Sequence, residues 1–582
     1  MKKRSAAGAR ARHLVGLALA ASLAIAACGG DDDDDTAATT GSQSPVTTPS
    51  DTDAASDPTT ADTAASATTA GDGTEPPSTD AGPGTTAGDP LAGDGELSTT
   101  LPEVDPDGVI RFAYTLSPSQ GLDPHKTSLS QDTVWLAPLY DPLIIEMPDA
   151  SLVPGLATSW EFVDDNSALE MELREGVTFH DGTPFDAEAV KLNLERAKTV
   201  EGSAVAPLLA AVDTVEVVDP MTVRLTLNSP AATLPRILAD RPGMMISPAA
   251  MDDPNLPTNP VGAGMYQIEE YRTGDRAIMV RFEDYWNPDW VQLARLEIVA
   301  QAEALTRLNG LRSGEVELAL LDGQTFEDAE SAGLATEQFF TTTNQHLQFN
   351  RTRAEFDNVL VRQAMNYAID RQAIVDVAYN GYGHASSQFY SPDFEQGYVE
   401  GMDDYYPYDP DKARELLAEA GLEDGFSFDL LVPNLTFSQA VAQIAQAQFA
   451  EVGITVNFIP VDASATAATF FNDKIGDVVV GTTPGRTDPS MLVQLYFTEE
   501  ANSNPGGHTI PEVTAAYEES LVPRPDAERV PILKEMMAQT VEQAGQIWIS
   551  QPTTLLGGIE GISGFHWSLR GQPDFRGVGV AG

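Results

Sequence analysis

The sequence predicts an α/β protein with more than one domain, on three observations. The chain has 582 residues, more than a single hydrophobic core usually organises. Apolar and charged residues alternate at positions 169–174, which is the period of a strand with one buried face. Apolar residues then recur at spacings of three and four, the period of an amphipathic helix, at Ala187, Val190, Leu194 and Ala197.

The turn between this strand and this helix has its own signals. Residues 180–184, His-Asp-Gly-Thr-Pro, are of types that supply or tolerate turn dihedral angles. Asp186 stands where a helix N-cap is expected, and Glu188 in the first turn suits the positive end of the helix dipole. Strand, tight turn and helix are therefore expected to form one compact unit.

Residues 1–27 have the features of an export signal. Basic residues come first, and an apolar stretch at 14–27 follows that is too short to span a bilayer comfortably. Residues 25–28, Ile-Ala-Ala-Cys, resemble a lipobox, after which the cysteine is lipidated and becomes the new N-terminus. The chain has no other cysteine than Cys28, which favours lipidation over ordinary secretion with the cysteine discarded.

Residues 28–107 predict an acidic, disordered tether. The segment consists mainly of Asp, Thr, Ala, Ser, Gly and Pro, and no lysine or arginine occurs between Arg12 and Arg111. Such a composition buries too little apolar area to offset the entropy lost on folding, and its charges repel one another. A calcium site at residues 31–35 is the alternative, but the run lacks the glycine and the distal glutamate of a calcium loop.

Composition and motifs exclude several classes of function. The formal net charge is −54, whereas nucleic acids and anionic lipids require basic patches on their partners. The chain lacks the motifs of serine hydrolases, nucleotide-binding loops and zinc proteases, so neither an enzyme nor a cofactor is expected. A single cysteine allows no internal disulfide. We expect no metal site, and we expect His125 to be a turn histidine, because no second histidine or cysteine lies at ligand spacing.

The order of residues from Pro154 to Phe185 resembles the signature of family 5 extracellular solute-binding proteins, the peptide- and nickel-binding lipoproteins of bacterial ABC importers. That signature runs P-x-LA-x-SW and then LR-x-GV-x-FHDGTPF, and nearly every position is filled here. Other segments also resemble the family, at residues 122–125 (LDPH), 139–144 (LYDPLI), 259–266 (NPVGAGMY), 284–286 (DYW), 308–321 and 356–371.

The resemblance implies a two-lobed periplasmic-binding-protein fold of type II, with an extra subdomain in lobe I as in cluster C of that fold. By analogy, lobe I takes residues 108–345 and contains the subdomain near 155–255. Lobe II takes residues 346–545, and residues 546–582 return to lobe I. The same resemblance implies a monomer anchored on the extracytoplasmic face of the cell membrane.

The function implied by the resemblance is capture of a peptide-like or other small polar solute between the lobes. Closure on the solute would then allow delivery to an ABC permease in the membrane. Two alternatives stay open: an adhesion or signalling lipoprotein that keeps the fold without transport, and a carrier of metal chelates.

The remaining periodic segments predict the elements of both lobes. One helix is expected from a cap at residues 356–358 through Arg371, another from Pro410 to just before Gly421, and a third over residues 527–545. Strands are expected at residues 109–114, 212–218, 221–227, 454–461, 477–480, 547–549 and 555–556.

Eight residues are candidates for the ligand site through the resemblance: Ser117, Gly264, Met265, Asn350, Thr482, Gly485, Arg486 and Asp488. Family members that hold a peptide's amino terminus place an aspartate three residues before a D/E-P pair. A gapless comparison on Asp488-Pro489 puts Gly485 at that place, and Arg486 adds a cation beside it.

Ordinary peptides with free amino termini are therefore expected to bind poorly, because their ammonium would lack its carboxylate partner. An oxyanion facing Arg486 should bind better, and Gly485→Asp is expected to restore peptide binding. The alternative for Arg486 is an ion pair at the surface or between the lobes.

The lipobox generates the first prediction. Cys28→Ala should release the protein from the membrane fraction, because an alanine offers no thiol for lipidation. Fractionation of cells that express the wild-type protein and the variant measures this. A variant that stays with the membranes like the wild type would contradict the lipobox.

Overall fold

The computed structural model describes residues 103–582 except 119, 128–129 and 502, all within one compact unit of the chain, Gly84–Gly582. The expected export signal, Cys28 and most of the expected tether lie outside the described residues. Val104 forms a β-bridge with Ala581, and the backbone N–H of Asp105 donates to the carbonyl of Val580 at 2.8 Å. Ordered pairing thus begins a few residues before the expected start of lobe I.

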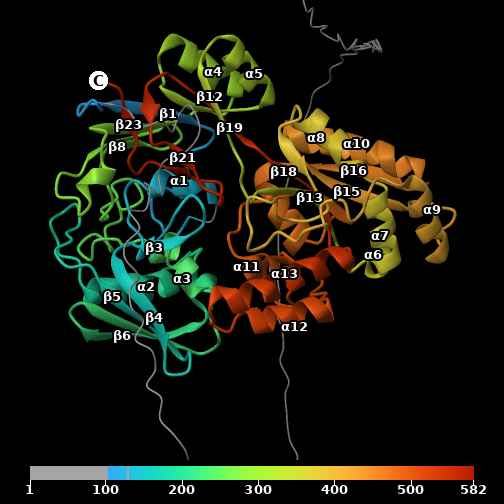
Figure 1. The fold of residues 1–582 in the computed structure, drawn as a ribbon, viewed down its shortest axis with the longest axis horizontal. Coiled ribbons are helices and arrows are strands. Elements are labelled where there is room, and N and C mark those ends of the chain that lie inside the picture. Colours follow the sequence, from blue (N-terminus) through green and yellow to red (C-terminus); the bar gives the residue numbers. More distant parts are fainter. Residues whose placement is uncertain (1–102, 119, 128–129, 502) are drawn as a thin grey trace, which may run out of the picture. The chain divides into compact units, whose positions relative to one another are not determined.

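The first of two large sheets forms lobe I (Figure 1). Its seven strands lie in the order β12-β19-β11-β1-β10-β9-β8. The central strand β1 (Val109–Tyr114) pairs in parallel with β10 (Arg295–Ala300) and β11 (Leu318–Leu321) and buries Ile110 and Phe112 completely. The other strands and the helices near this sheet are β8 (Tyr266–Arg272), β9 (Arg276–Arg281), β12 (Ala335–Phe339), β19 (Thr554–Gly558), α1 (Thr133–Leu136), α4 (Ala304–Ser313) and α5 (Gly323–Ser331).

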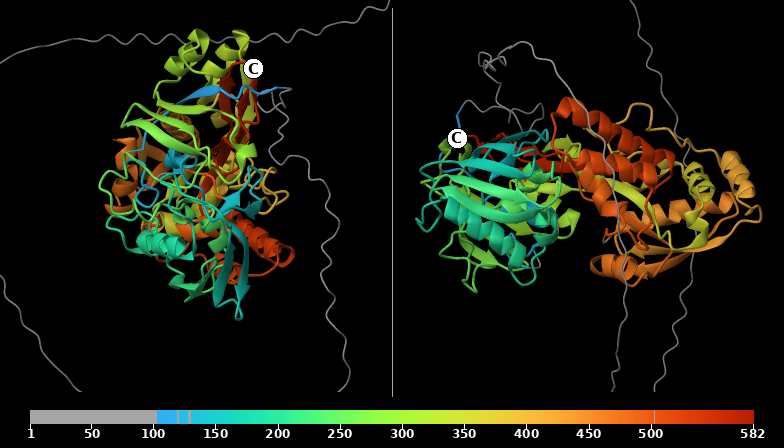
Figure 2. Two further views of the ribbon diagram at one scale, coloured as in Figure 1. Left: turned by 90° about the vertical axis from the view of Figure 1, so that its left-hand side faces the viewer. Right: turned by 90° about the horizontal axis from the view of Figure 1, so that it is seen from below.

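An antiparallel four-stranded sheet in the order β4-β5-β7-β6 forms the subdomain. Helix α2 (Ala187–Thr199) lies against it, as Figure 2 shows from below, and Asp186 caps the helix by accepting the N–H of Ala189 at 2.9 Å. The four helix residues expected to be apolar and inward are all buried, which confirms the strand, turn and helix unit. The strands are β4 (Ala157–Val163), β5 (Ala168–Leu173), β6 (Val212–Asp219) and β7 (Thr222–Leu227).

The second large sheet forms lobe II, with six strands in the order β14-β18-β13-β17-β15-β16. Parallel strands β15, β16 and β17 follow the alternation of strand and helix in this part of the chain. The strands are β13 (Asn344–Phe349), β14 (Gly383–Ala385), β15 (Ser427–Pro433), β16 (Thr455–Val461), β17 (Val478–Thr483) and β18 (Ile547–Pro552). Helices of this lobe include α9 (Pro410–Glu419), α10 (Thr436–Glu451), α11 (Pro489–Tyr496), α12 (Pro511–Ser520) and α13 (Asp526–Glu542).

The chain crosses between the two large sheets twice. The first crossing lies between β12 and β13, near the boundary expected at residues 345–346. The second lies between β18 and β19, because β18 pairs with β13 of lobe II and β19 pairs with β11 of lobe I (Figure 1). The return to lobe I therefore begins after Pro552 rather than at residue 546.

One expected helix is in fact two. Helix α7 (Val359–Tyr367) begins after Asn358, whose side chain accepts the N–H of Leu360, and it ends before Asp370. The carboxylate of Asp370 accepts the N–H of Ala373 and caps a new helix, α8 (Arg371–Ala378). Aspartate competes for backbone N–H groups and favours an N-cap over a helix interior, which apolar periodicity alone does not reveal.

His125 is a buried structural residue, as expected. Its Nδ1 accepts a hydrogen bond from Nη1 of Arg196 at 2.9 Å, and the same guanidinium pairs with Asp123 at 2.7 Å. Burial lowers the pKa of His125 to about 3, and the Arg196 charge acts in the same direction, so the imidazole is neutral. The histidine thus helps to hold the turn before η1 (Ser130–Asp132) against α2.

Asp141 is a buried carboxylate in the loop between α1 and β2 (Ile144–Glu146). The Tyr285 hydroxyl and the Trp286 indole N–H both donate to its Oδ2, at 2.9 and 2.6 Å. Burial nevertheless raises the pKa of Asp141 to about 6, because two neutral donors do not replace full hydration of the charge. The folded state therefore favours protonation of Asp141 more than the unfolded chain does.

The elevated pKa of Asp141 generates a prediction about stability and pH. A group whose folded pKa exceeds its unfolded value stabilises the fold most below the unfolded pKa and loses this contribution as pH rises through the folded pKa. Asp141→Asn keeps an acceptor but does not ionise. As pH rises from 4 to 7, the free energy of unfolding of the variant should therefore increase relative to that of the wild type, by up to about 3 kcal/mol. Chemical unfolding across this pH range measures the difference. The exposed Asp213→Asn is the control, and a pH-independent difference for Asp141→Asn would contradict the prediction.

Candidate functional site

A cavity of about 800 Å³ lies between the two lobes. One wall comes from the subdomain region and includes η2 (Ala206–Leu209), α3 (Leu234–Ile237) and η3 (Arg241–Gly243). The facing wall comes from lobe II, chiefly α11, the segment after it and α12. Arg570, from the C-terminal segment that returns to lobe I, completes the lining. A volume of this size suits a small organic solute.

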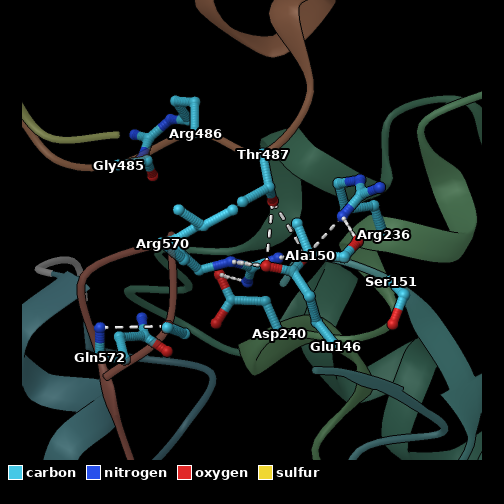
Figure 3. Close-up of polar contacts among 12 residues, drawn as sticks. Glu146, Ala150, Ser151, Arg236, Asp240, Gly485, Arg486, Thr487, Arg570 and Gln572 are labelled. Atoms are coloured by element: carbon cyan, nitrogen blue, oxygen red, sulfur yellow. Dashed lines mark hydrogen bonds and ion pairs between the residues drawn. The ribbon is translucent and has the colours of Figure 1, made fainter. Parts of the chain in front are cut away.

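Glu146 is the centre of the polar contacts beside this cavity (Figure 3). Its carboxylate accepts hydrogen bonds from Arg236 at 2.8 Å and from Arg570 at 2.5 and 3.1 Å. The hydroxyl of Thr487, in lobe II, lies 2.9 and 3.0 Å from its two oxygens. A single buried carboxylate therefore connects the end of β2, helix α3, the C-terminal segment and lobe II.

Asp240 supplies the second carboxylate of this cluster. It lies 3.2 Å from the guanidinium of Arg570 and 4.0 Å from that of Arg241. Although burial opposes ionisation, the charges of Arg570 and Arg241 lower the pKa of Asp240, so it is an anion at neutral pH. Burial likewise opposes the charge on Arg570, but Glu146 and Asp240 raise its pKa. Asp240 and Arg570 thus stabilise each other's charged forms.

Arg486 lies next to this cluster but outside its ion pairs. Its Nη1 donates to the carbonyls of Gly485 and Pro484 at 3.1 and 3.4 Å, both in its own loop. Within residues 103–582 as described, no carboxylate lies within 4.0 Å of its guanidinium. Burial lowers the pKa of Arg486, and the nearby charge of Arg570 acts in the same direction. The alternative expected for Arg486, an ion pair, is not what the structure shows.

Gly485 lines the cavity at a point of close backbone approach. A Cβ atom at this position would lie 2.5 Å from the carbonyl oxygen of Arg570 and 2.8 Å from Oγ1 of Thr342. Glycine is therefore needed for this loop to pack against the C-terminal segment. Gly485→Asp, expected from the sequence to restore peptide binding, would displace Arg570 instead of adding a simple carboxylate.

Three other candidates in lobe II serve the fold rather than the cavity. Asp488 is buried, caps α11 and pairs with Arg529 at 2.6 Å, so its carboxylate is fully used within lobe II. Thr482 donates to Gln345 on the neighbouring strand at 2.9 Å. Asn350 bonds the turn after β13 through Thr352. None of the three lines the cavity.

The three candidates in lobe I also lie away from the cavity. The Ser117 hydroxyl accepts the N–H of Gly274 in the turn between β8 and β9. Gly264 packs against the backbone of Leu139, where a Cβ would lie 2.4 Å from a carbonyl carbon. Met265 is buried and lines a separate cavity of about 100 Å³ in lobe I. Of the eight candidates, only Gly485 and Arg486 line the interlobe cavity.

The residues that sequence reasoning missed come from segments far apart in the chain. Glu146 follows the LYDPLI segment, and Arg570 lies beyond the part of the chain that the resemblance covers. Charged residues are abundant, and most are solvated, so type and spacing could not single these out. The only local signal was the position of residue 146 shortly after a matched motif. The missed charged residues of the site are Glu146, Arg236, Asp240, Arg241, Glu499, Glu500, Glu518 and Arg570.

Comparisons with known proteins agree with this architecture. Residues 151–504 match the family described as bacterial extracellular solute-binding proteins, family 5, middle part. The glutathione-binding protein GsiB of Salmonella paratyphi A is 34% identical over 355 residues, which cover 60% of this chain and 68% of the relative. GsiB of Pectobacterium atrosepticum is 28% identical over 484 residues, or 79% of this chain and 91% of the relative.

Solved structures show the same fold. The binding protein AgaA from A. tumefaciens R10, in complex with agropinic acid, superposes with a TM-score of 0.70 at 25% identity over 82% of this chain and 99% of that one. DppA from Helicobacter pylori, in complex with the peptide STSA, superposes with a TM-score of 0.71 at 22% identity over 82% and 98% of the two chains.

The fold and the interlobe cavity thus define a two-lobed periplasmic-binding-protein fold of type II, as the resemblance implied. The chain belongs to family 5 of the bacterial extracellular solute-binding proteins, which act in transport rather than catalysis. Among the described residues, no helix combines the length and apolarity needed to cross a membrane. The same residues contain no group of three histidine, cysteine or carboxylate side chains placed to hold a metal ion.

The Glu146 cluster generates a prediction about stability. Glu146→Gln keeps the shape but removes the charge that balances two buried arginines, so the free energy of unfolding should fall by about 3–5 kcal/mol. Glu355→Gln is the matched control, because Glu355 pairs with Arg353 at 3.1 Å near the surface and should cost less than about 1 kcal/mol. Chemical unfolding compares the two variants, and equal losses would show that the Glu146 contacts contribute no more than a surface pair.

Proposed function

We propose that this protein is the substrate-binding component of an ABC importer and captures a peptide-like or other small polar solute between its lobes. The observation that carries the proposal is the cavity of about 800 Å³, whose walls come from both lobes. In this proposal Cys28 carries a lipid anchor, the protein is a monomer on the extracytoplasmic face of the membrane, and the ligand-bound form docks on a permease.

Because the cavity lies between the lobes, a bound ligand should favour closure of the lobes. A solute that touches both walls binds the closed form better than the open form and shifts the population toward closure. The lobes also contact one another directly, through Thr487 with Glu146 and through the N–H of Ala232, which donates to the carbonyl of Leu521 at 2.9 Å. In this proposal such contacts orient closure, and the ligand adds further stabilisation.

The relatives support a small polar solute with a carboxylate. Their names assign glutathione to GsiB, agropinic acid to AgaA and a short peptide to the Helicobacter pylori protein. A cavity of this volume holds solutes of that size. Arginines in its lining offer the planar donors that suit carboxylates.

The function is tested by narrowing the cavity. Gln494 is an exposed residue of α11 that lines the cavity, so Gln494→Trp adds bulk there without overpacking a core. Native mass spectrometry of protein purified from its own host should show a small molecule bound to the wild type and little or none bound to the variant. Gln439→Trp, on the exposed side of α10 and outside the lining, is the control and should retain the molecule. Equal loading of all three proteins, or of none, would contradict the proposal.

A further inference from the structure

Arginines outnumber carboxylates at the inner wall of the interlobe cavity. Arg236 and Arg570 bind Glu146, and Arg570 and Arg241 face Asp240. Three arginines therefore share two carboxylates, of which Glu146 is buried and Asp240 is partly exposed. The charge of Asp240 also reaches a fourth arginine, Arg486, and opposes the lowering of its pKa by burial, but among the described residues no carboxylate of this cluster lies within 4.0 Å of that guanidinium.

Arg486 is that fourth arginine. Among the described residues its Nε and Nη2 groups have no hydrogen-bond acceptor, and its Nη1 reaches only carbonyls of its own loop. Figure 3 shows Arg486 apart from the contacts that surround Glu146. A guanidinium has five N–H donors in a planar fork, and two of them can hold one carboxylate. The free edge of Arg486 in the cavity lining is thus suited to an anionic group of a ligand.

Unpaired carboxylates line another part of the same cavity. Glu499 and Glu500 follow α11, Glu518 lies on α12, and all three are exposed to solvent. Within the described part of the chain none of them lies within 4.0 Å of a basic group. They form an acidic rim on the lobe II side, where a cationic group of a ligand would find partners.

Apolar side chains complete the lining between and around these charged groups. Ile237, Leu208, Met491 and Leu495 all face the cavity, from both walls. A solute with a short apolar or amide body would bury surface against them, whereas a small inorganic ion would not. The lining therefore offers a cationic contact, an apolar body and an acidic rim.

We propose, on the basis of the proposed function, that the cargo is a zwitterionic amino-acid or peptide derivative, held with a carboxylate on Arg486 and an ammonium toward the rim of Glu499, Glu500 and Glu518. The sequence alone predicts poor binding of peptides with free amino termini, because no carboxylate stands at position 485. In the proposed orientation the acidic rim takes the place of that carboxylate, so such peptides can bind. The carboxylates of the rim are the partners of the ammonium. Because the rim is exposed to solvent, screening weakens their attraction to it. The carboxylate contact with Arg486 is the dominant one.

Two zwitterionic probes test the charge pattern, glutathione and trialanine, each compared with its N-acetylated form and with its C-terminal amide. At least one zwitterion should bind in calorimetric titration at low salt. For trialanine, the amide should bind about tenfold or more weakly than the acid, and the acetylated form only several-fold more weakly. Raising the salt concentration should reduce the preference for a free ammonium more than the preference for a free carboxylate.

Variants assign these preferences to residues. Arg486→Ala should remove the preference for acid over amide, and Arg486→Lys should retain part of it. The triple change of Glu499, Glu500 and Glu518 to Gln should remove the preference for the free ammonium and leave binding of the acetylated acid unchanged. Arg414→Ala, an exposed change on α9 outside the lining, is the control and should match the wild type.

Two outcomes would overturn the inference. One is that neither probe binds at millimolar concentration, and the other is that Arg486→Ala binds the acid and the amide with the wild-type preference. Neither outcome contradicts the proposed function if Gln494→Trp still removes the molecule that co-purifies with the wild type. If one of these two outcomes occurs and Gln494→Trp also fails to remove the co-purifying molecule, the inference and the proposed function are both contradicted.

Discussion

The buried carboxylate of Glu146 is the interaction on which the architecture of the site depends. Two guanidiniums and one hydroxyl reach it from three separate segments, at residues 236, 487 and 570. Removing a carboxylate from water is costly, and only close opposite charges with good geometry offset that cost. The segments must therefore meet at this point together, which ties the subdomain and the C-terminal segment to each other and presents a polar contact to lobe II.

The arrangement also explains the charge of the interlobe cavity. Glu146 and Asp240 form ion pairs with Arg236, Arg241 and Arg570. The neighbouring Arg486 forms no ion pair within 4.0 Å among the described residues. Burial removes part of the hydration of this guanidinium and lowers the pKa of Arg486. In the site that we propose, an anion bound to Arg486 would relieve that condition, and a ligand that also touched the facing wall would couple recognition to lobe closure.

Much of the fold could be predicted from the sequence, whereas most of the site could not. The strand at residues 169–174 and the helix capped by Asp186 formed as their periodicity predicted, because amphipathic periods report burial directly. The helix expected through Arg371 was divided, because Asp370 caps a new helix. Six of the eight candidates lie outside the lining of the interlobe cavity, and some of them, Asp488 among them, hold turns, strands or helix ends, since a family motif records structural and binding residues alike.

The sequence by itself determined the family, the type II fold, the mixture of strand and helix, and the presence of glycine and arginine at positions 485 and 486. Only the tertiary structure decided which charges remain unpaired. The carboxylate three residues after Gly485 pairs with Arg529 inside lobe II, while the carboxylates that pair with the arginines of the inner wall come from residues 146 and 240. Ion pairing depends on distances of a few ångströms between segments hundreds of residues apart, and no local pattern in the chain records those distances.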